Sequence, residues 1–164
     1  MAALAVMVGG CLPALPRVES RPTPTFDPIA FFEGPTEGLG TLSVRARSPV
    51  LVRVESVGTR RPDGGLSLRQ TIRRGGGPTT ERTWELAPDG PGRYAGTLTD
   101  ADGPVEAWAD GDRLSIRYGM GGGLSMRQEL TLQPGGDLAL NLATVRWLGV
   151  PVARLSEQIR RVGR

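Results

Sequence analysis

The chain has 164 residues, enough for one domain with a single core, and it contains no histidine and no lysine. Ser-His-Asp, Cys-His and Ser-Lys catalytic arrangements and His-ligated metal sites are therefore excluded, and we predict neither a metal site nor a cofactor. The net charge is only +3 and both signs are scattered along the chain, a pattern that does not indicate a nucleic-acid-binding surface.

The amino terminus has the pattern of a bacterial lipoprotein signal. The apolar run 4–8 leads through two glycines to Cys11, the only cysteine of the chain. Small residues before a lone cysteine are typical of a lipoprotein cleavage site, although no Lys or Arg precedes the run here. The alternative is a short apolar helix with a buried thiol. We expect residues 1–10 to be a signal peptide and Cys11 to be the lipid attachment site.

The segment that follows is rich in proline. Residues 12–25 contain four prolines and no apolar periodicity, which favours an extended tether, so that 11–25 comprise the lipidated cysteine and its tether. Leu12 rather than aspartate follows the cysteine, and we therefore expect the protein at the periplasmic face of the outer membrane of a Gram-negative bacterium. The membrane is then a partner through the lipid anchor.

From Phe26 onward, apolar and polar residues alternate with a period of two, as in half-buried antiparallel strands. The alternation is found in the segments 50–55, 66–73, 83–86, 93–99, 113–118 and 124–133, with turn clusters rich in Gly, Pro and Asp between most of them. We predict that residues 26–164 form one all-β domain, an antiparallel up-and-down meander of about ten strands that closes into a barrel.

The last part of the chain is less regular. Residues 150–162 fit either a returning strand or a short amphipathic helix with Val152, Leu155 and Ile159 along one side. We predict a short C-terminal helix over 155–162.

Two glutamines occupy positions that the alternation assigns to the interior. Gln70 and Gln128 each lie on the apolar face of a predicted strand, where a buried amide must form hydrogen bonds. They either orient a ligand inside the barrel or pair with other protein groups. Together with the large rings of Trp84 and Tyr118, they are our candidate ligand-binding residues, although aromatic rings on strands also fit an ordinary core.

Three carboxylates and one tryptophan remain as candidates for other roles. Glu106, Asp110 and Asp112 show no sign of the separation across a cleft that paired glycosidase carboxylates need. We therefore expect no enzymatic activity, with a carboxylate-based hydrolase as the least favoured alternative. Trp108 shares a strand face with Glu106 and Asp110, and we expect it to be exposed at a contact surface.

Short motifs also carry a family resemblance. They are Phe31–Gly34, Trp84–Leu86, Gly92–Gly96 and Leu140–Val145. With these motifs, the chain from Phe26 to its end resembles the proteobacterial lipoproteins of the domain-of-unknown-function family DUF3833. The resemblance implies a lipocalin-like β-barrel and no established activity.

These features together predict a non-enzymatic lipoprotein of the cell envelope that binds a small apolar or amphiphilic ligand in its barrel. The alternative is an envelope scaffold or protein-interaction module without a ligand cavity, whose partner would be an envelope protein. We expect no nucleic-acid partner.

Overall fold

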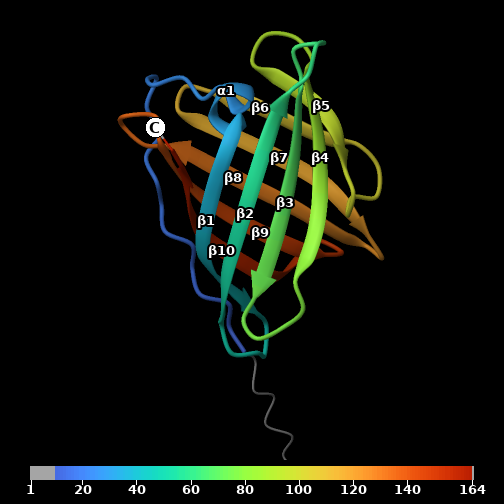
Figure 1. The fold of residues 1–164 in the computed structure, drawn as a ribbon. Coiled ribbons are helices and arrows are strands. Elements are labelled where there is room, and N and C mark those ends of the chain that lie inside the picture. The colour runs from blue at the N-terminus through green and yellow to red at the C-terminus, as the bar shows by residue number, and fades with distance from the viewer. Residues whose placement is uncertain (1–9, 164) are drawn as a thin grey trace, which may run out of the picture.

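The computed structural model describes residues 10–163, which form a closed barrel of ten antiparallel strands with one short helix (Figure 1). The elements are α1 (Pro28–Phe32), β1 (Gly34–Val44), β2 (Val50–Arg60), β3 (Leu66–Arg74), β4 (Thr80–Pro88), β5 (Arg93–Leu98), β6 (Val105–Asp110), β7 (Arg113–Gly121), β8 (Leu124–Leu132), β9 (Leu138–Trp147) and β10 (Val150–Arg161). Each strand pairs with the next one along the chain, and β1 pairs with β10 to close the sheet. The predicted all-β meander that closes into a barrel is confirmed.

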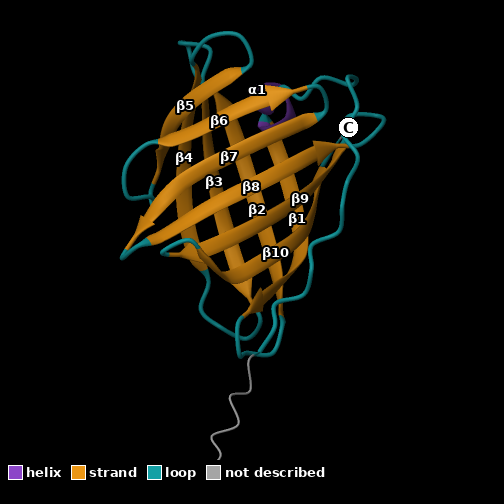
Figure 2. Cartoon of the chain, turned by 180° about the vertical axis from the view of Figure 1, so that it is seen from behind, coloured by secondary structure: helices purple, strands orange, loops and turns teal. Residues whose placement is uncertain are grey.

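Alternating apolar and polar residues produce the two faces of the barrel wall. In β3, Leu66, Leu68 and Ile72 are buried inside, whereas Arg69 is exposed to solvent. A strand turns successive side chains to opposite faces, so one face fills the interior and the other is wet. Figure 2, the view from behind, shows β7–β10 crossing steeply in front of the β1–β4 wall, as expected for tilted strands of a barrel.

The helix α1 begins at a local capping signal. Asp27 precedes it, and its Oδ1 accepts hydrogen bonds from the amides of Ile29 and Ala30 at 2.9 and 3.2 Å. Pro28 occupies the first turn, where its missing N–H has no intrahelical partner to lose. The helix has five residues, too few for the apolar periodicity that reveals longer helices in a sequence, and it was not predicted.

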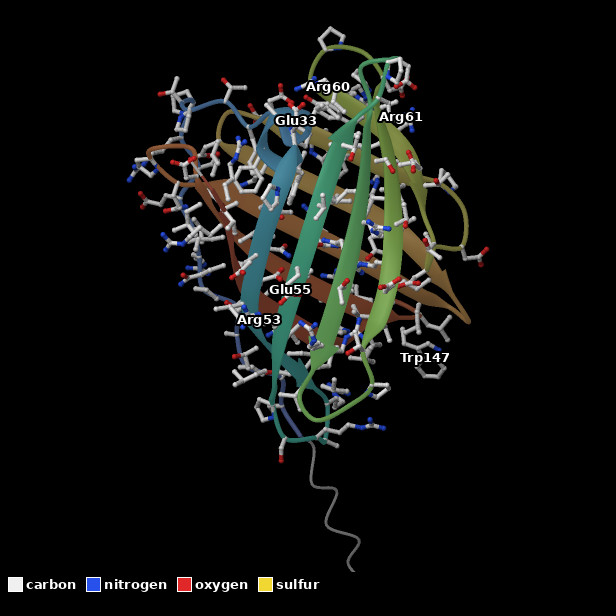
Figure 3. All side chains as sticks on the ribbon, in the orientation of Figure 1. Glu33, Arg53, Glu55, Arg60, Arg61 and Trp147 are labelled. Atoms are coloured by element: carbon white, nitrogen blue, oxygen red, sulfur yellow. The ribbon has the colours of Figure 1, made fainter. Side chains whose placement is uncertain are left out.

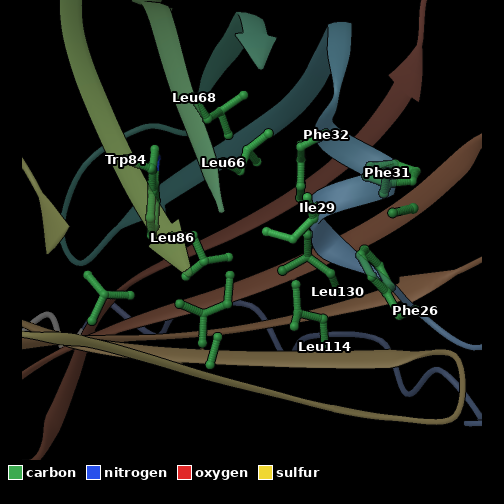
Figure 4. Close-up of a cluster of buried hydrophobic side chains, with 14 of the residues drawn as sticks. Phe26, Ile29, Phe31, Phe32, Leu66, Leu68, Trp84, Leu86, Leu114 and Leu130 are labelled. Carbon is green, nitrogen blue, oxygen red and sulfur yellow. The ribbon is translucent and has the colours of Figure 1, made fainter. Parts of the chain in front are cut away.

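Aromatic side chains around α1 close one end of the barrel. The ring centres of Phe26 and Phe31 lie 5.3 Å apart, and those of Phe31 and Phe32 lie 4.9 Å apart in an edge-to-face arrangement. These rings pack with Leu66 and Leu114 in the main core (Figure 4). We call this the closed end. The opposite end, formed by the β1–β2, β3–β4, β5–β6, β7–β8 and β9–β10 hairpin loops, has no helix across it within residues 10–163 and is called the open end.

The C-terminal residues 155–162 are not helical, so this prediction was wrong. Residues 150–161 form β10, which pairs with β1 on one side and with β9 on the other. Its inward residues, among them Ala153, Glu157 and Ile159, follow a period of two. The strand conformation prevails because β10 closes the barrel, and without it β1 and β9 would present unpaired edges.

The N-terminal segment 10–25 lies along the outside of the barrel (Figure 1). Near the closed end, Asp112 Oδ1 accepts a hydrogen bond from the Arg21 amide at 2.9 Å. Near the open end, the Arg154 guanidinium donates to the carbonyl oxygen of Pro13. The segment therefore runs from the β1–β2 loop at the open end to α1 at the closed end and is held at both places.

Charged pairs cover the outer wall (Figure 3). Arg53 Nε lies 3.3 Å from Glu55 Oε1, and Arg60 Nη2 lies 2.9 Å from Glu33 Oε2. Such exposed pairs contribute little to the free energy of unfolding because solvent screens them, so the stability of the fold depends mainly on its interior.

Within residues 10–163, no helix combines the length and the apolar character needed to cross a membrane. The predicted signal peptide lies outside the described residues except for Gly10.

Candidate ligand-binding site

A cavity of about 260 Å³ lies inside the barrel, and every strand except β5 and β6 contributes to its wall. Its volume is just below the range of about 300–1,000 Å³ that is usual for small-molecule sites. Pro28 and Phe32 line it at the closed end, and Arg74, Met120 and Val145 line it at the open end. The cavity therefore extends along the barrel from α1 to the open end.

The wall of the cavity is apolar at both ends and polar in the middle. Toward the closed end it is lined by Phe32, Leu66, Leu86, Leu114, Leu130 and Ile159. Toward the open end it is lined by Leu42, Val52, Val54, Ile72, Met126 and Leu155. Between these two zones lies a ring of hydrogen-bonded side chains, which we call the polar belt: Ser56, Gln70, Arg82, Trp84, Tyr118, Gln128, Asn141 and Glu157.

One half of the polar belt is centred on Gln70. Its Nε2 donates to Ser56 Oγ at 3.1 Å, and its Oε1 accepts from Trp84 Nε1 at 2.7 Å and from Arg82 Nε at 2.8 Å. The Gln70 amide thus has partners on both its oxygen and its nitrogen, as a buried amide requires. The Gln70 oxygen is fully engaged, and most of the remaining donors in this half belong to Arg82, whose guanidinium carries five N–H groups.

The other half is centred on Gln128. Its Nε2 donates to Tyr118 Oη at 3.4 Å, and its Oε1 accepts from Asn141 Nδ2 at 3.2 Å. The same Asn141 nitrogen donates to Glu157 Oε2 at 2.9 Å. Burial raises the pKa of the Tyr118 hydroxyl above its ordinary value, against smaller lowering effects from Arg82 and Gln128. Tyr118 therefore stays protonated and can donate as well as accept.

Aromatic contacts join the two halves. The rings of Trp84 and Tyr118 meet edge to face with their centres 5.6 Å apart. The Arg82 guanidinium carbon lies 5.3 Å from the centre of the Trp84 ring, within the range of a cation–π contact. The belt is therefore one connected structure, and it holds its single arginine next to an aromatic surface.

Glu157 is the buried carboxyl group of the belt. Burial raises its pKa above the ordinary value, and the hydrogen bond from Asn141 and the charge of Arg82 offset only part of that rise. The facing strand β1 has Gly38 here, and a Cβ on Gly38 would lie only 2.1 Å from Glu157 Oε1. The absence of a side chain at Gly38 thus makes room for the carboxyl group.

One acceptor of the belt has no partner. Asn141 is 3% exposed and lines the cavity, and its Oδ1 forms no hydrogen bond within the described chain. A buried polar atom without a partner is unfavourable by about 1–3 kcal/mol, so this oxygen would gain from a donor inside the cavity.

All four residues predicted as candidate ligand-binding groups point into the barrel interior. Gln70, Trp84 and Gln128 line the cavity itself, and Tyr118 lies directly behind it through its contacts with Trp84 and Gln128. The two glutamines pair with protein side chains, so their amides have a structural role whether or not a ligand is present.

Four members of the belt were missed from the sequence: Ser56, Arg82, Asn141 and Glu157. Each interrupts the apolar face of its strand with a polar or charged side chain, and so resembles an outward residue. The inward position of Glu157 was harder still to recognise, because residues 155–162 were predicted to be helical. The regular two-residue spacing of Ala153, Leu155, Glu157 and Ile159 could have revealed it.

The acidic residues considered for hydrolysis do not converge. Glu106 forms an exposed pair with Arg117, at 2.7 Å, on the outer wall. Asp112 is buried, but it holds the N-terminal segment through Ser20 and Arg21. None of these residues lines the cavity, and residues 10–163 contain no cluster of acidic or thiol side chains suited to a metal ion.

Trp108 is half-buried rather than exposed. The Arg117 guanidinium carbon lies 5.1 Å from the centre of its ring and covers part of it. The outer wall therefore offers less apolar surface at Trp108 than the sequence suggested.

The fold is similar to two solved structures. One is the S-type phycobiliprotein lyase CPES from Guillardia theta, with a TM-score of 0.64 and 10% identity over 83% of this chain and 91% of that chain. The other is a protein of unknown function from the DUF3598 family of Nostoc punctiforme, with a TM-score of 0.63 and 16% identity over 85% of this chain and 50% of that chain. This chain thus spans about half the length of the second protein. At these identities the likeness shows the fold alone.

No curated protein sequence is significantly similar to this chain. The family model described as "Protein of unknown function (DUF3833)" matches residues 5–161. That match spans the whole barrel and agrees with the resemblance found in the short motifs. The chain therefore belongs to the DUF3833 family.

Proposed function

We propose that this chain is a lipid-anchored protein of the cell envelope whose barrel binds a small amphiphilic molecule with an acidic head group. The lipid is attached to Cys11 and holds the protein at the periplasmic face of the outer membrane. The observation that carries the proposal is the cavity of about 260 Å³ with apolar zones on both sides of a polar belt.

The two apolar zones favour a ligand with hydrocarbon surface. Burying apolar area contributes about 25 cal/mol per Å², so a chain or ring system lying against Leu66, Leu114 and Val54 would gain most of its affinity there. The similarity in fold to a phycobiliprotein lyase is compatible with a barrel that encloses such a cavity.

The polar belt favours an acidic head group. Arg82 forms no ion pair with a carboxylate of the described chain, because its partner is the neutral amide of Gln70. Glu157, the nearby carboxyl group, has a raised pKa and so holds a proton more readily than an exposed glutamate. Arg82 therefore lacks an ion-pair partner within the described chain, and a carboxylate or phosphate of a ligand would supply one.

Ligand binding can be tested directly on the whole protein. Native mass spectrometry of protein extracted from its own cells is expected to show a bound small molecule, and a fluorescent fatty acid, cis-parinaric acid, is expected to bind and to be displaced by the extracted compound.

A cavity-filling variant supplies the control. Ala143 lies inside the wall opposite Gln128, so Ala143→Phe should abolish probe binding. Gln158 is exposed on the outer wall, and Gln158→Phe should leave binding unchanged. A protein that carries no compound and binds the probe equally in both variants would contradict the proposed ligand.

The anchor can be tested separately by mass spectrometry of the native amino terminus. We expect a diacylglyceryl group on Cys11 and loss of residues 1–10, and we expect Cys11→Ser to release the protein from membranes. Recovery of an unmodified chain that retains residues 1–10 would contradict the anchoring.

A further inference from the structure

We infer that the open end of the barrel is a membrane-docking surface that rests on a bilayer containing anionic phospholipids. The inference goes beyond the proposed function, because it concerns the orientation of the barrel on the membrane and holds whether or not the cavity takes a ligand. It rests on the position of the N-terminal segment, on apolar side chains and on charge.

The described chain begins at the open end. Gly10 packs against the β1–β2 loop so closely that a Cβ on it would lie 2.9 Å from the Ala46 nitrogen. Cys11 is exposed beside it and borders a shallow depression with Arg47 and Pro49. Arg154 fixes the following residues through Pro13. A lipid on Cys11 would therefore enter a membrane next to the open end, on the opposite side of the molecule from α1.

Exposed apolar side chains gather at the same end. Of the eight large hydrophobic side chains that are exposed within residues 10–163, five lie there: Val50, Leu51, Trp147, Leu148 and Val150. We call these five residues the apolar rim. Figure 3 shows Trp147 projecting from the edge of the barrel, and it is 52% exposed. Tryptophan is enriched at the boundary between membrane and water, where its ring sits among head groups.

Leu148 is a residue that folding alone does not explain. It has a φ of +46° and forms the β9–β10 turn with Gly149, whose φ is +85°. Turn positions of this kind favour Asn, Asp or Gly, because other side chains are strained there. Leu148 is also 71% exposed, so it accepts the strain without gaining burial within the described chain. Insertion into a bilayer would supply that burial.

Hydrogen bonds join the β7–β8 and β9–β10 loops at the open end. The Leu148 amide donates to Gly123 O at 2.9 Å, and Trp147 Nε1 donates to Gly122 O at 3.2 Å. These bonds hold Trp147 and Leu148 in place side by side. A preformed apolar edge loses less conformational entropy on membrane binding than a mobile one.

Charge distinguishes the two ends of the barrel. At the open end, the β1–β2 loop carries Arg45 and Arg47, and Arg74 stands at the end of β3. The β1–β2, β3–β4, β7–β8 and β9–β10 loops contain no Asp or Glu. The acidic residues at this end are Asp100 and Asp102, both in the β5–β6 loop, and Glu81, the second residue of β4.

The closed end carries most of the acidic loop residues, Asp27, Asp63, Asp89, Asp112 and Asp137, but it also carries Arg60, Arg61, Arg93, Arg160 and Arg161, so that both signs are mixed there. An anionic bilayer would attract the arginines of the open end more strongly than the mixed charges of the closed end. Charge and apolar surface therefore favour the same orientation, and the cavity then opens toward the bilayer.

The test uses the full chain with Cys11→Ser in every sample, so that no acyl chain contributes. Binding is measured by flotation with vesicles of phosphatidylethanolamine and phosphatidylglycerol, and with neutral phosphatidylcholine vesicles. The apolar rim is altered by Leu51→Ser with Leu148→Asn, of which the second replaces leucine by a residue that suits the turn. Its matched control is Leu39→Ser with Val57→Ser, two exposed positions on the β1–β2 wall.

The charge of the open end is altered by Arg45→Gln with Arg47→Gln. Its matched control is Arg93→Gln with Arg160→Gln, which removes the same charge at the closed end. Each of the two double variants at the open end is expected to lower partitioning onto anionic vesicles by about 10- to 30-fold. Each control double variant is expected to lower it by less than about twofold.

A second measurement reports contact of the rim with lipid. Brominated phospholipids are expected to quench part of the tryptophan fluorescence of vesicle-bound protein. Trp147→Phe should remove this quenching, and Trp108→Phe should retain it, because Trp108 lies on the wall beneath Arg117.

Equal losses in rim and wall variants would overturn the inference, since binding would then come from segments common to all of them. Equal binding to neutral and anionic vesicles would overturn the choice of an anionic bilayer. A protein that docks through the rim but takes no ligand would leave the inference standing and contradict the proposed ligand binding.

Discussion

Gly38 of β1 and Glu157 of β10 share one space in the barrel wall: a Cβ on Gly38 would lie 2.1 Å from Glu157 Oε1. Glu157 is 7% exposed, and its carboxyl group accepts a hydrogen bond from Asn141, its directly paired neighbour on β9. A barrel strand without a side chain at one position thus lets a buried acid complete the polar belt. We therefore expect substitutions of Gly38 and of Glu157 to have coupled effects on the stability of the fold.

We expect Gly38→Ala to destabilise the fold by about 1–3 kcal/mol, because the new methyl group must displace the Glu157 carboxyl group. The loss should shrink by about 1 kcal/mol or more when Glu157→Ala is already present, since the clash is then gone. Urea unfolding of both single variants and the double variant measures this coupling. Gly76→Ala is the control, because a Cβ there meets nothing within 4 Å. Additive losses would mean that the two residues do not compete for space.

The pH dependence of stability should report the same carboxyl group. Burial raises the pKa of Glu157 above its ordinary value of 4.5. Between the two pKa values the folded protein binds more protons than the unfolded chain, so the contribution of Glu157 to the free energy of unfolding falls as the pH rises through this window. That contribution is complete below the ordinary value and is lost above the raised one.

Glu157→Gln cannot titrate, so its stability relative to the unsubstituted protein should increase as the pH rises above 4.5. Thermal unfolding across a series of buffers measures this difference. Glu81→Gln, at an exposed position on β4, is the control for the substitution itself. A relative stability of Glu157→Gln that decreases with pH would show that the folded-state pKa is lowered instead.

The sequence predicted the barrel because most inward positions are apolar and follow a period of two. The same rule explains what it missed. Arg82 and Glu157 are charged residues on inward positions, so a pattern of apolar residues cannot place them inside. Gln70 and Gln128 were identified because an amide stands out on a strand face that is otherwise apolar. Residues 155–162 were mistaken for a helix because Val152, Leu155 and Ile159 also fit helical spacing, and only pairing with β1 decides between the two.

The N-terminal segment shows another limit of sequence-based prediction. Its prolines indicate an extended chain, but its position depends on residues more than 90 positions away. Asp112 Oδ1 accepts from Ser20 Oγ and from the Arg21 amide, both at 2.9 Å. We expect Asp112→Ala to loosen the segment and to speed tryptic cleavage after Arg17 and Arg21 several-fold, because a buried acceptor of two hydrogen bonds is lost.

Limited proteolysis followed by mass spectrometry measures the cleavage rates at these two sites. Asp110→Ala provides the comparison, since Asp110 is exposed at the end of β6. Unchanged cleavage in Asp112→Ala would mean that contacts elsewhere along the segment hold it to the barrel.

The arginine of the belt leads to the last prediction. Arg82 uses its Nε for Gln70 and keeps its guanidinium beside the Trp84 ring, at 5.3 Å from the ring centre. If an acidic head group binds there, Arg82→Gln should lower the affinity for cis-parinaric acid by about 10-fold or more. The reason is that a charge-assisted hydrogen bond contributes about 1.5–3 kcal/mol. The methyl ester of the same probe has no negative charge, so its affinity should change little. Arg69→Gln, which removes a charge from the outer face of β3, should affect neither compound. Fluorescence titration of the acid and the ester with all three proteins separates a head-group contact from a general loss of charge, and an equal loss for acid and ester would assign Arg82 to the structure of the belt alone.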